Sequence, residues 1–323
     1  MTNENSRDFS LEKLALITAS NIKGVGYWTL YKFVANSGDL SDLLNCKTQD
    51  EFEALLHIKL QIKAGVWLEY LEDRKLHAKK TLDNFRKSGI QIVLYGESGF
   101  PQKLMDIVDP PYWLFVQGNI QLLSNKSIAV VGTRNPTQEG DRIARYVIES
   151  LIGCGYVTIS GLANGIDQIV HEESLRCNLP TIAILGTGIN NNYPAGSFIL
   201  RSQIIEHGGA IVTEYLPSQS YSAENFIRRN RLQAALCDVL IPVEWAIKSG
   251  TAHTVSFASK YRKKIINIYL PGTYDSRPEI IFSQKNYRSK SYSTEKISDF
   301  RAELLSSVTE NTPTILKQIS LDI

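Results

Sequence analysis

The sequence has few cysteines and almost no net charge. Its four cysteines, Cys46, Cys154, Cys177 and Cys237, are far apart and include no C-x-x-C pair. That spacing disfavours both a zinc site and a disulfide framework. We therefore expect no metal site, and reduced thiols that fit a cytosolic protein. The formal net charge of +2 excludes a generally polycationic DNA-coating protein, so any attraction for nucleic acid must come from a local patch.

Long apolar runs and the common nucleotide-binding motifs are also missing. No segment approaches the roughly 18 apolar residues that span a bilayer, and the polar start MTNENSRDFS lacks the apolar core of a signal peptide. We therefore expect a cytoplasmic protein without membrane contact. The pattern G-x-x-x-x-G-K-[ST] is absent, and G-x-G-x-x-G does not follow the apolar segment SIAVVG. A Walker-type ATPase site and a dinucleotide cofactor are thus disfavoured.

Residues 1–87 are patterned as helices. Apolar residues recur there at three- and four-residue intervals, and no convincing strand is present. Within IKGVGYWTLYKFV, Gly24 and Gly26 mark a tight turn that resembles a helix-hairpin-helix. In that motif the glycines let backbone N–H groups approach a phosphate. A plain turn between two helices explains the same residues and is the favoured interpretation.

Residues 88–275 alternate short β-branched segments with amphipathic ones. The expected strands are IQIVLYG, YWLFVQG, SIAVVG, YVTIS, TIAILG, AIVTEY, DVLIPVE and KIINIYLPG. Strands and helices in this order predict an α/β fold with a doubly wound, mostly parallel sheet covered on both faces. Ligands on such sheets bind at the carboxyl ends of the strands. Residues 276–323 turn polar, and we expect a loose appendage there without a clear winged helix.

Consecutive predicted strands end in loops that could hold an anion. In AVVGTRNP, Gly132 permits a sharp turn, and Thr133 and Arg134 stand where the next helix begins. Backbone N–H groups, a hydroxyl and a guanidinium at a helix start suit a phosphate. A turn with Arg134 facing solvent is the alternative. The next loop, TISGLANGID, repeats the pattern with Ser160 and Gly161, and the third, ILGTGINNNYP, is glycine-rich as well.

Asp167 and His171 are four residues apart and are expected on one face of a helix. A carboxylate that orients a histidine is an arrangement used for general-base catalysis. No nucleophile motif such as G-x-S-x-G accompanies the pair. The favoured interpretation is that the two side chains fix the loop, and no catalytic residue is predicted.

The stretch FIRRNRLQAAL places three arginines between Phe226 and an apolar segment. Arg228, Arg229 and Arg231 either solvate a helix end or hold an anion. Phe226 offers a ring on which a base could stack, worth roughly 1 to 3 kcal/mol. Farther along, KSGT again precedes an expected helix, as at an N-terminal anion site. A solvated edge without any ligand is the alternative for the whole rim.

Six motifs, in this order and spacing, resemble the DNA-processing protein A family, also called DprA or Smf: SIAVVGTR, ISGLANGIDQIVHEESL, TIAILGTGINNNYP, TEYLP, FIRRNR and VEWAIKSGTAHT. The similarity covers about residues 90–272. The helical N-terminal region resembles that family's helix-hairpin-helix or SAM-like domain. The resemblance implies an extended Rossmann fold that binds single-stranded DNA without catalysis and forms a homodimer. In bacterial transformation the family protects incoming strands and loads the RecA recombinase onto them.

The resemblance and the strand-end loops together define a predicted nucleic-acid site. Its members are Gly132, Thr133, Arg134, Ser160, Gly161, Phe226, Arg229, Asn230, Arg231, Lys248, Ser249 and Gly250. In this interpretation Phe226 stacks a base, while the arginines and the loop amides contact phosphates. Arg228 has no counterpart in the family motif, and solvation is its plain explanation.

Departures from the family pattern leave two other functions open. The family's SGSLITA is replaced by SGTAHT, and an LI-x-x-GA element is missing after Gly272. These changes indicate a divergent paralogue, for which defence against phage is one setting. One alternative is a nucleotide-processing enzyme, since the core also resembles nucleoside-monophosphate phosphoribohydrolases; Val255 stands where their glutamate would be. The other is a regulatory module that contacts proteins.

Overall fold

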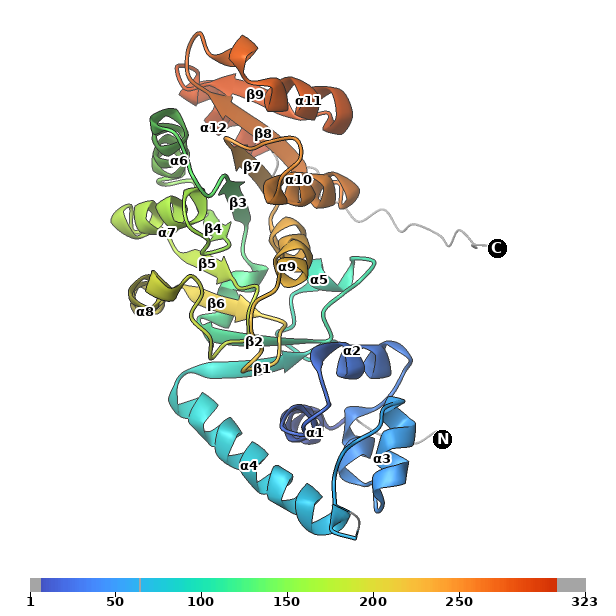
Figure 1. The fold of residues 1–323 in the computed structure, drawn as a ribbon. Helices are drawn as coiled ribbons and strands as arrows, with labels where there is room; N and C mark the ends of the chain where they lie inside the picture. The colour runs from blue at the N-terminus through green and yellow to red at the C-terminus, as the bar shows by residue number, and fades with distance from the viewer. Residues whose placement is uncertain (1–6, 64, 307–323) are drawn as a thin grey trace, which may run out of the picture.

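The chain begins with a group of helices at one end of the molecule (Figure 1). This computed structural model describes residues 7–63 and 65–306. The first helices are α1 Phe9–Ser20, α2 Tyr27–Ala35, the short 3₁₀ helix η1 Leu40–Leu44, α3 Gln49–Leu56 and α4 Trp67–Lys87. Their apolar side chains form a shared core that includes the fully buried Leu16, Leu30 and Phe52. The Phe85 and Phe115 rings meet edge to face and join α4 to the sheet that follows.

A nine-stranded sheet of spatial order β1-β2-β6-β5-β4-β3-β7-β8-β9 forms the second region. Its strands are β1 Ile90–Leu94, β2 Trp113–Gly118, β3 Ser127–Gly132, β4 Val157–Ser160, β5 Thr181–Ile184, β6 Ala210–Thr213, β7 Val239–Val243, β8 Lys264–Tyr269 and β9 Lys290–Ser293. β2 is antiparallel to both β1 and β6, and all other neighbouring pairs are parallel. The predicted doubly wound, mostly parallel α/β sheet is confirmed, with all eight expected strands.

Helices cover both faces of this sheet because its central strands are apolar on both sides. On one face lie α5 Gln102–Met105, the 3₁₀ helix η2 Ile120–Ser124, α9 Ala223–Leu236 and α10 Gly250–Lys260. On the other lie α6 Gln138–Ser150, α7 Ile166–Arg176 and α8 Phe198–Glu206, with the helical region beyond α8. Strand β3 shows the alternation: Ala129 and Val131 contact the first face, and Ile128 and Val130 contact the second.

The segment after residue 275 belongs to the sheet, which corrects the expected loose appendage. It contains the 3₁₀ helix η4 Tyr274–Ser276, α11 Pro278–Tyr287, β9 and α12 Ile297–Ser306. β9 pairs in parallel with β8, and Phe300 and Leu304 of α12 are fully buried against the sheet. Because β9 lies at the edge of the sheet, its sequence KSYS is short and polar. Such a sequence is not recognisable as a strand. The rest of the expected appendage, 307–323, lies outside the described residues.

Glu303 of α12 links the last two strands. Its carboxylate accepts hydrogen bonds from Lys264 Nζ of β8 at 2.5 Å and from Lys290 Nζ of β9 at 2.7 Å. The Tyr292 hydroxyl donates to the same carboxylate at 3.1 Å. Burial alone would raise the pKa of Glu303, but these three hydrogen bonds outweigh it and lower the pKa to about 2. The charged form of Glu303 therefore stabilises the fold.

Replacing Glu303 with glutamine is expected to destabilise the protein at pH 7 by about 1–3 kcal/mol. Because the folded-state pKa lies below the unfolded value, this contribution is present above about pH 4.5 and declines as the pH falls toward 2. Urea unfolding at pH 7 and pH 3.5 measures it. The exposed Glu295→Gln is the control. An equal difference between wild type and Glu303→Gln at both pH values would contradict the assignment.

Candidate nucleic-acid interface

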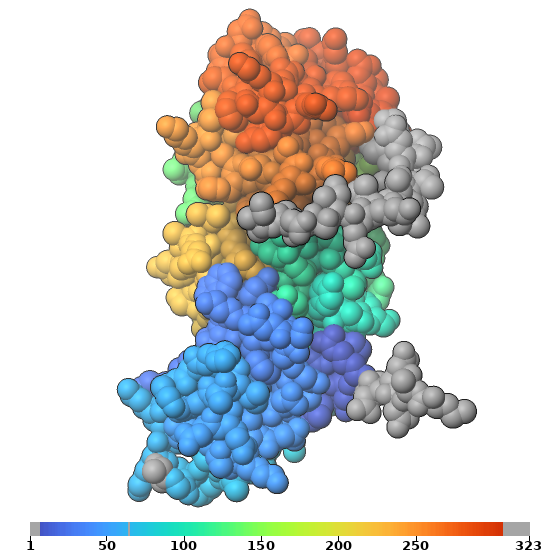
Figure 2. All heavy atoms as spheres, turned by 90° about the vertical axis from the view of Figure 1, so that its right-hand side faces the viewer, coloured from blue at the N-terminus to red at the C-terminus, as the bar shows by residue number. Residues whose placement is uncertain are grey.

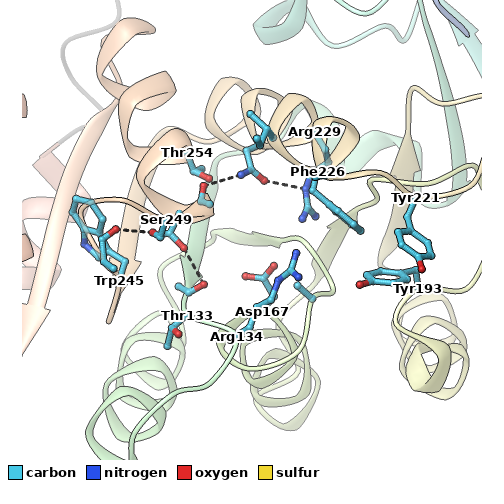
Figure 3. Close-up of a pocket in the computed structure, with 18 residues that line it drawn as sticks. Thr133, Arg134, Asp167, Tyr193, Tyr221, Phe226, Arg229, Trp245, Ser249 and Thr254 are labelled. Atoms are coloured by element: carbon cyan, nitrogen blue, oxygen red, sulfur yellow. Dashed lines mark hydrogen bonds between the residues drawn. The ribbon is translucent and has the colours of Figure 1, made fainter.

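A pocket of about 540 Å³ lies at the carboxyl ends of β3, β4 and β7. β4 and β7 flank β3 on opposite sides, so the order of the strands reverses next to β3. This switch point is where open α/β sheets bind their ligands. In Figure 3, Phe226 and Arg229 come from α9 on one side, and Thr133 and Arg134 of the loop after β3 and Asp167 of the first turn of α7 face them.

Gly132 and Thr133 connect the end of β3 to the loop after β7. A Cβ atom on Gly132 would lie 2.0 Å from the Val243 carbonyl oxygen, so a side chain cannot be accommodated. The Thr133 N–H donates to the Glu244 carbonyl at 3.0 Å. The Glu244 carboxylate accepts from the N–H of Thr137, the cap of α6, at 2.9 Å. The N–H groups of Thr133 and Thr137 thus already have partners within the protein and are not free for a phosphate, while a phosphate contact by the rest of the loop stays a prediction.

Arg134 and Phe226 meet at the centre of the pocket. Arg134 is exposed, and its guanidinium carbon lies 5.4 Å from the centroid of the half-buried Phe226 ring. The guanidinium carbon of Arg229 lies 5.8 Å from the same centroid. On its other side the ring packs on Gly186, where a Cβ atom would come within 2.5 Å of it. Phe226 is therefore an accessible aromatic ring held by a close backbone contact and by two cation–π contacts.

Ser160 and Gly161 lie behind the pocket wall, which corrects their predicted contact with a ligand. Ser160 is fully buried, and its hydroxyl donates to the Val130 carbonyl at 2.7 Å. The Gly161 carbonyl accepts from Arg229 Nη1 at 2.7 Å, and the Ile184 carbonyl accepts from the same nitrogen. These contacts point carbonyl oxygens at Arg229. The loop therefore positions an arginine and does not present N–H groups to a phosphate.

Asp167 adds a carboxylate to the pocket wall. Burial raises the pKa of this carboxyl group, while Arg229 and the Ser160 hydroxyl act in the opposite direction. No hydrogen bond joins Asp167 to His171 among the described residues. Instead His171 Nδ1 lies 2.8 Å from the Thr181 hydroxyl of β5, and burial lowers the pKa of the histidine to about 3. His171 is a neutral residue that secures α7 to the sheet.

Asn230 joins α9 to the start of α10. Its Nδ2 donates to the Gly250 carbonyl at 3.0 Å, and its Oδ1 accepts from Arg229 Nε at 3.2 Å. The hydroxyl of Ser249 caps α10 by accepting the Ala252 N–H at 3.3 Å. Three members of the predicted site, Asn230, Ser249 and Gly250, line the pocket, whereas the exposed Lys248 lies beside the lining residues.

Arg231 faces away from the pocket. Its side chain is 1% exposed, and its two terminal nitrogens each lie 2.7 Å from a carboxylate oxygen of Glu214. Its Nε donates to the Asp109 carboxylate at 2.9 Å. The Tyr27 hydroxyl of α2 donates to the same Glu214 carboxylate at 2.6 Å. A guanidinium held in this way cannot reach a phosphate, so the prediction for Arg231 is wrong.

Arg228 contacts the helical region and is not solvated as expected. Its guanidinium carbon lies 4.6 Å from the Trp28 ring centroid and 4.7 Å from that of Tyr31, both on α2. Figure 2 shows the helical region, in blue, directly against the sheet region. The turn before α2 directs Tyr27 into this contact. That geometry supports a plain helix–helix turn over a phosphate-binding hairpin.

Two tyrosines of the pocket were not predicted from the sequence. Tyr193 precedes α8 and Tyr221 precedes α9, and both line the pocket. Their ring centroids are 4.5 Å apart, and Tyr193 lies 5.1 Å from Phe226. Tyr221 stands in SQSYSAE, a polar segment without a motif. The one feature of the sequence that could have pointed to Tyr221 is that an aromatic residue stands within a polar loop.

Within residues 7–63 and 65–306, no three histidine, cysteine, aspartate or glutamate side chains come together to hold a metal ion. None of the helices in that part of the chain has both the length and the apolar character to cross a bilayer. Val255, at the position of the phosphoribohydrolase glutamate, is fully buried in α10 and lies outside the pocket lining.

The model of the family described as DNA recombination-mediator protein A matches residues 91–304, about two thirds of the chain. That range holds the sheet, the pocket and α9. The chain belongs to this family of DNA-processing proteins. Protein Smf of Escherichia coli K12 is 36% identical over 173 residues, which are 54% of this chain. The matched part is 46% of the Escherichia coli protein, so the chain spans less than half the length of that relative.

Two solved structures of this family resemble the chain. DNA processing protein A from Streptococcus pneumoniae has a TM-score of 0.63 at 23% identity and covers 90% of this chain and 97% of its own, which shows a shared fold. DNA processing protein A from Helicobacter pylori has a TM-score of 0.57 at 27% identity and covers 67% of this chain and 96% of its own. The Helicobacter pylori structure describes a single-stranded DNA binding mode.

Substituting Arg231 with methionine is expected to destabilise the protein by about 3–5 kcal/mol, because the buried Glu214 carboxylate loses its two-pronged partner and keeps only the more distant Arg228 Nε, at 3.8 Å. Adding Glu214→Gln to that variant removes the unpaired charge and restores part of the stability. Urea unfolding of both variants measures these changes. Arg142→Ala, at an exposed position on α6, is the control and should change stability by less than about 0.5 kcal/mol. A similarly small effect of Arg231→Met would refute the structural role.

Proposed function

We propose that this protein binds single-stranded DNA in the pocket at the carboxyl ends of β3, β4 and β7. The observation that carries the proposal is the accessible Phe226 ring beside the exposed Arg134. A base can stack on such a ring, and the cation beside the ring can hold the neighbouring phosphate. The relative from Helicobacter pylori, whose structure describes a single-stranded DNA binding mode, supports the same class of ligand.

The proposed contacts divide between charge and hydrogen bonding. Arg134 supplies the main charge for a phosphate, and Lys248 adds a second exposed cation beside the pocket. Thr133, Ser249 and Gly250 line the pocket and offer hydroxyl or backbone groups for weaker contacts. Arg229 is 3% exposed and donates hydrogen bonds to two carbonyls. It therefore positions the Phe226 ring, and its positive charge attracts a phosphate only from a distance. The binding role is non-catalytic and requires no cofactor.

The proposal extends to the setting in which the DNA is bound. Family membership supports a homodimer that acts in cytoplasmic DNA processing and delivers single strands to the RecA recombinase. The biological context is natural transformation or defence against phage. The SGTAHT segment at the start of α10 departs from the family pattern, so dimerisation and RecA delivery need direct measurement. Light scattering of the purified protein measures the first, and assembly of RecA on protein-coated strands measures the second.

Removing the Arg134 side chain is expected to weaken binding of a fluorescein-labelled dT20 oligomer and to lower its salt dependence. Each phosphate contact contributes about 0.7 to the slope of log K against log salt for single strands. Arg134→Ala should therefore reduce that slope by about 0.7. Anisotropy titrations at several salt concentrations measure both effects, and a duplex of the same length should bind more weakly than dT20.

The matched control for this experiment is Arg142→Ala, which removes the same charge from an exposed position on α6 outside the pocket. It should bind dT20 like the wild type. Equal affinities and slopes for wild type and Arg134→Ala would show that the pocket is not the DNA site.

Substitution of Gly186 by alanine is expected to displace the Phe226 ring and weaken dT20 binding. The added Cβ would lie 2.5 Å from a ring carbon of Phe226, so the ring must move. Anisotropy titration measures the affinity. Gly196→Ala, in the same loop, is the control because its Cβ would enter open space. If Gly186→Ala folds and binds dT20 as tightly as Gly196→Ala, the position of Phe226 does not matter for binding.

A further inference from the structure

Three aromatic rings form a bent row along one side of the pocket, and the two outer rings, Phe226 and Tyr221, also contact each other at 6.4 Å between centroids. The centroid of Phe226 lies 5.1 Å from that of Tyr193, which lies 4.5 Å from that of Tyr221. The planes of neighbouring rings differ by 33° and 42°, so none stands edge-on to the next. Figure 3 shows the two tyrosines at one end of the pocket, past Phe226. The row leads from the centre of the pocket toward solvent.

Exposure increases along this row. Phe226 and Tyr193 are partly buried, whereas Tyr221 is 58% exposed. Among the described residues, the Tyr221 hydroxyl makes no hydrogen bond. One side of the Tyr221 ring is covered by Tyr193, and the rest of the ring is available to a ligand. A large apolar ring in water at the end of a ligand pocket is an unfilled stacking surface.

The two loops that carry the tyrosines are fixed to each other. Gly188 N–H donates to the Gln219 carbonyl at 2.8 Å, and Asn190 N–H donates to the Pro217 carbonyl at 2.9 Å. The Asn191 side chain donates to the Gln219 carbonyl at 2.8 Å. The position of the tyrosines is thus set before any ligand arrives, which lowers the entropic cost of binding on them.

We propose that Tyr221, backed by Tyr193, is a second stacking site that takes the base next to the one on Phe226. This inference rests on the proposed function and extends it from one base to two neighbouring bases of the same strand. Stacking on aromatic side chains is open to every base because each base has a π-face. The occupant is the same DNA strand because the row is continuous with the pocket wall. Because the Phe226 and Tyr221 centroids are 6.4 Å apart, the strand passes directly from one ring to the other, outward over the loop before α9.

The test compares dT20 binding by wild type, Tyr221→Leu and Tyr221→Trp at several salt concentrations. Leucine keeps an apolar side chain but removes the ring, and it should weaken binding by about 5- to 150-fold. The slope of log K against log salt should stay unchanged, because no phosphate contact is lost. Tryptophan should restore the affinity. Phe198→Ala removes a ring that is 62% exposed on α8 and outside the pocket lining, and it should bind like wild type.

A second readout locates the base directly. Ultraviolet crosslinking of an oligomer with 5-iodouracil at each position, followed by mass spectrometry, should attach neighbouring nucleotides to Phe226 and Tyr221. If Tyr221→Leu binds like wild type while Arg134→Ala and Phe226→Ala lose affinity, the second site is refuted and the pocket stands. If none of the three variants loses affinity, the proposed function fails as well. A loss in Phe198→Ala equal to that in Tyr221→Leu would also overturn the second site.

Discussion

The buried ion pair between Arg231 and Glu214 sets the orientation of α9, and through it the shape of the pocket. Both side chains are 1% exposed, and a carboxylate so far from water needs a charged, two-pronged partner. Tyr27 from the helical region donates to this carboxylate, and the Trp113 indole donates to the Glu214 carbonyl at 2.7 Å. One acidic residue therefore joins the sheet, α9 and α2. Because α9 cannot rotate, the side chains on its opposite face have fixed positions.

The helical repeat explains why neighbouring arginines have different roles. Residues on an α-helix are separated by about 100°, so Arg229 and Arg231 point about 200° apart. Arg228 shares the face of Arg231: Arg228 contacts rings of α2, and Arg231 pairs with Glu214, to which Tyr27 of α2 also donates. Phe226 and Arg229 are three residues apart and share the pocket face. A cluster of positive charge in the sequence thus becomes one pocket residue and two residues that connect the regions.

Sequence reasoning succeeded where a local pattern determines the outcome. The buried strands are continuous apolar runs, so the sheet was predictable, and with it the position of Thr133 and Arg134 directly after β3. Arg231 was misassigned because its partner, Glu214, is 17 residues away and nothing local marks the pairing. The 3.6-residue repeat within FIRRNR did hold the signal that separates Arg229 from Arg231. The edge strand β9 and the contact between the tyrosine loops depend on tertiary pairing, which the sequence does not show.

In the proposed complex, the scarcity of exposed positive charge at the pocket decides which form of DNA is favoured. Arg229 is occupied by two carbonyls, and Asp167 adds a carboxyl group and no cation to the wall, so Arg134 and Lys248 are left as the main exposed cations of the predicted site. With so few phosphate contacts, binding must draw a large share of its free energy from stacking, at roughly 1 to 3 kcal/mol per base. Bases in a duplex are already stacked and paired, so their faces are not available to Phe226 or Tyr221. Preference for single strands therefore follows from the composition of the pocket: a site with few exposed cations and several rings recognises open bases more than backbone.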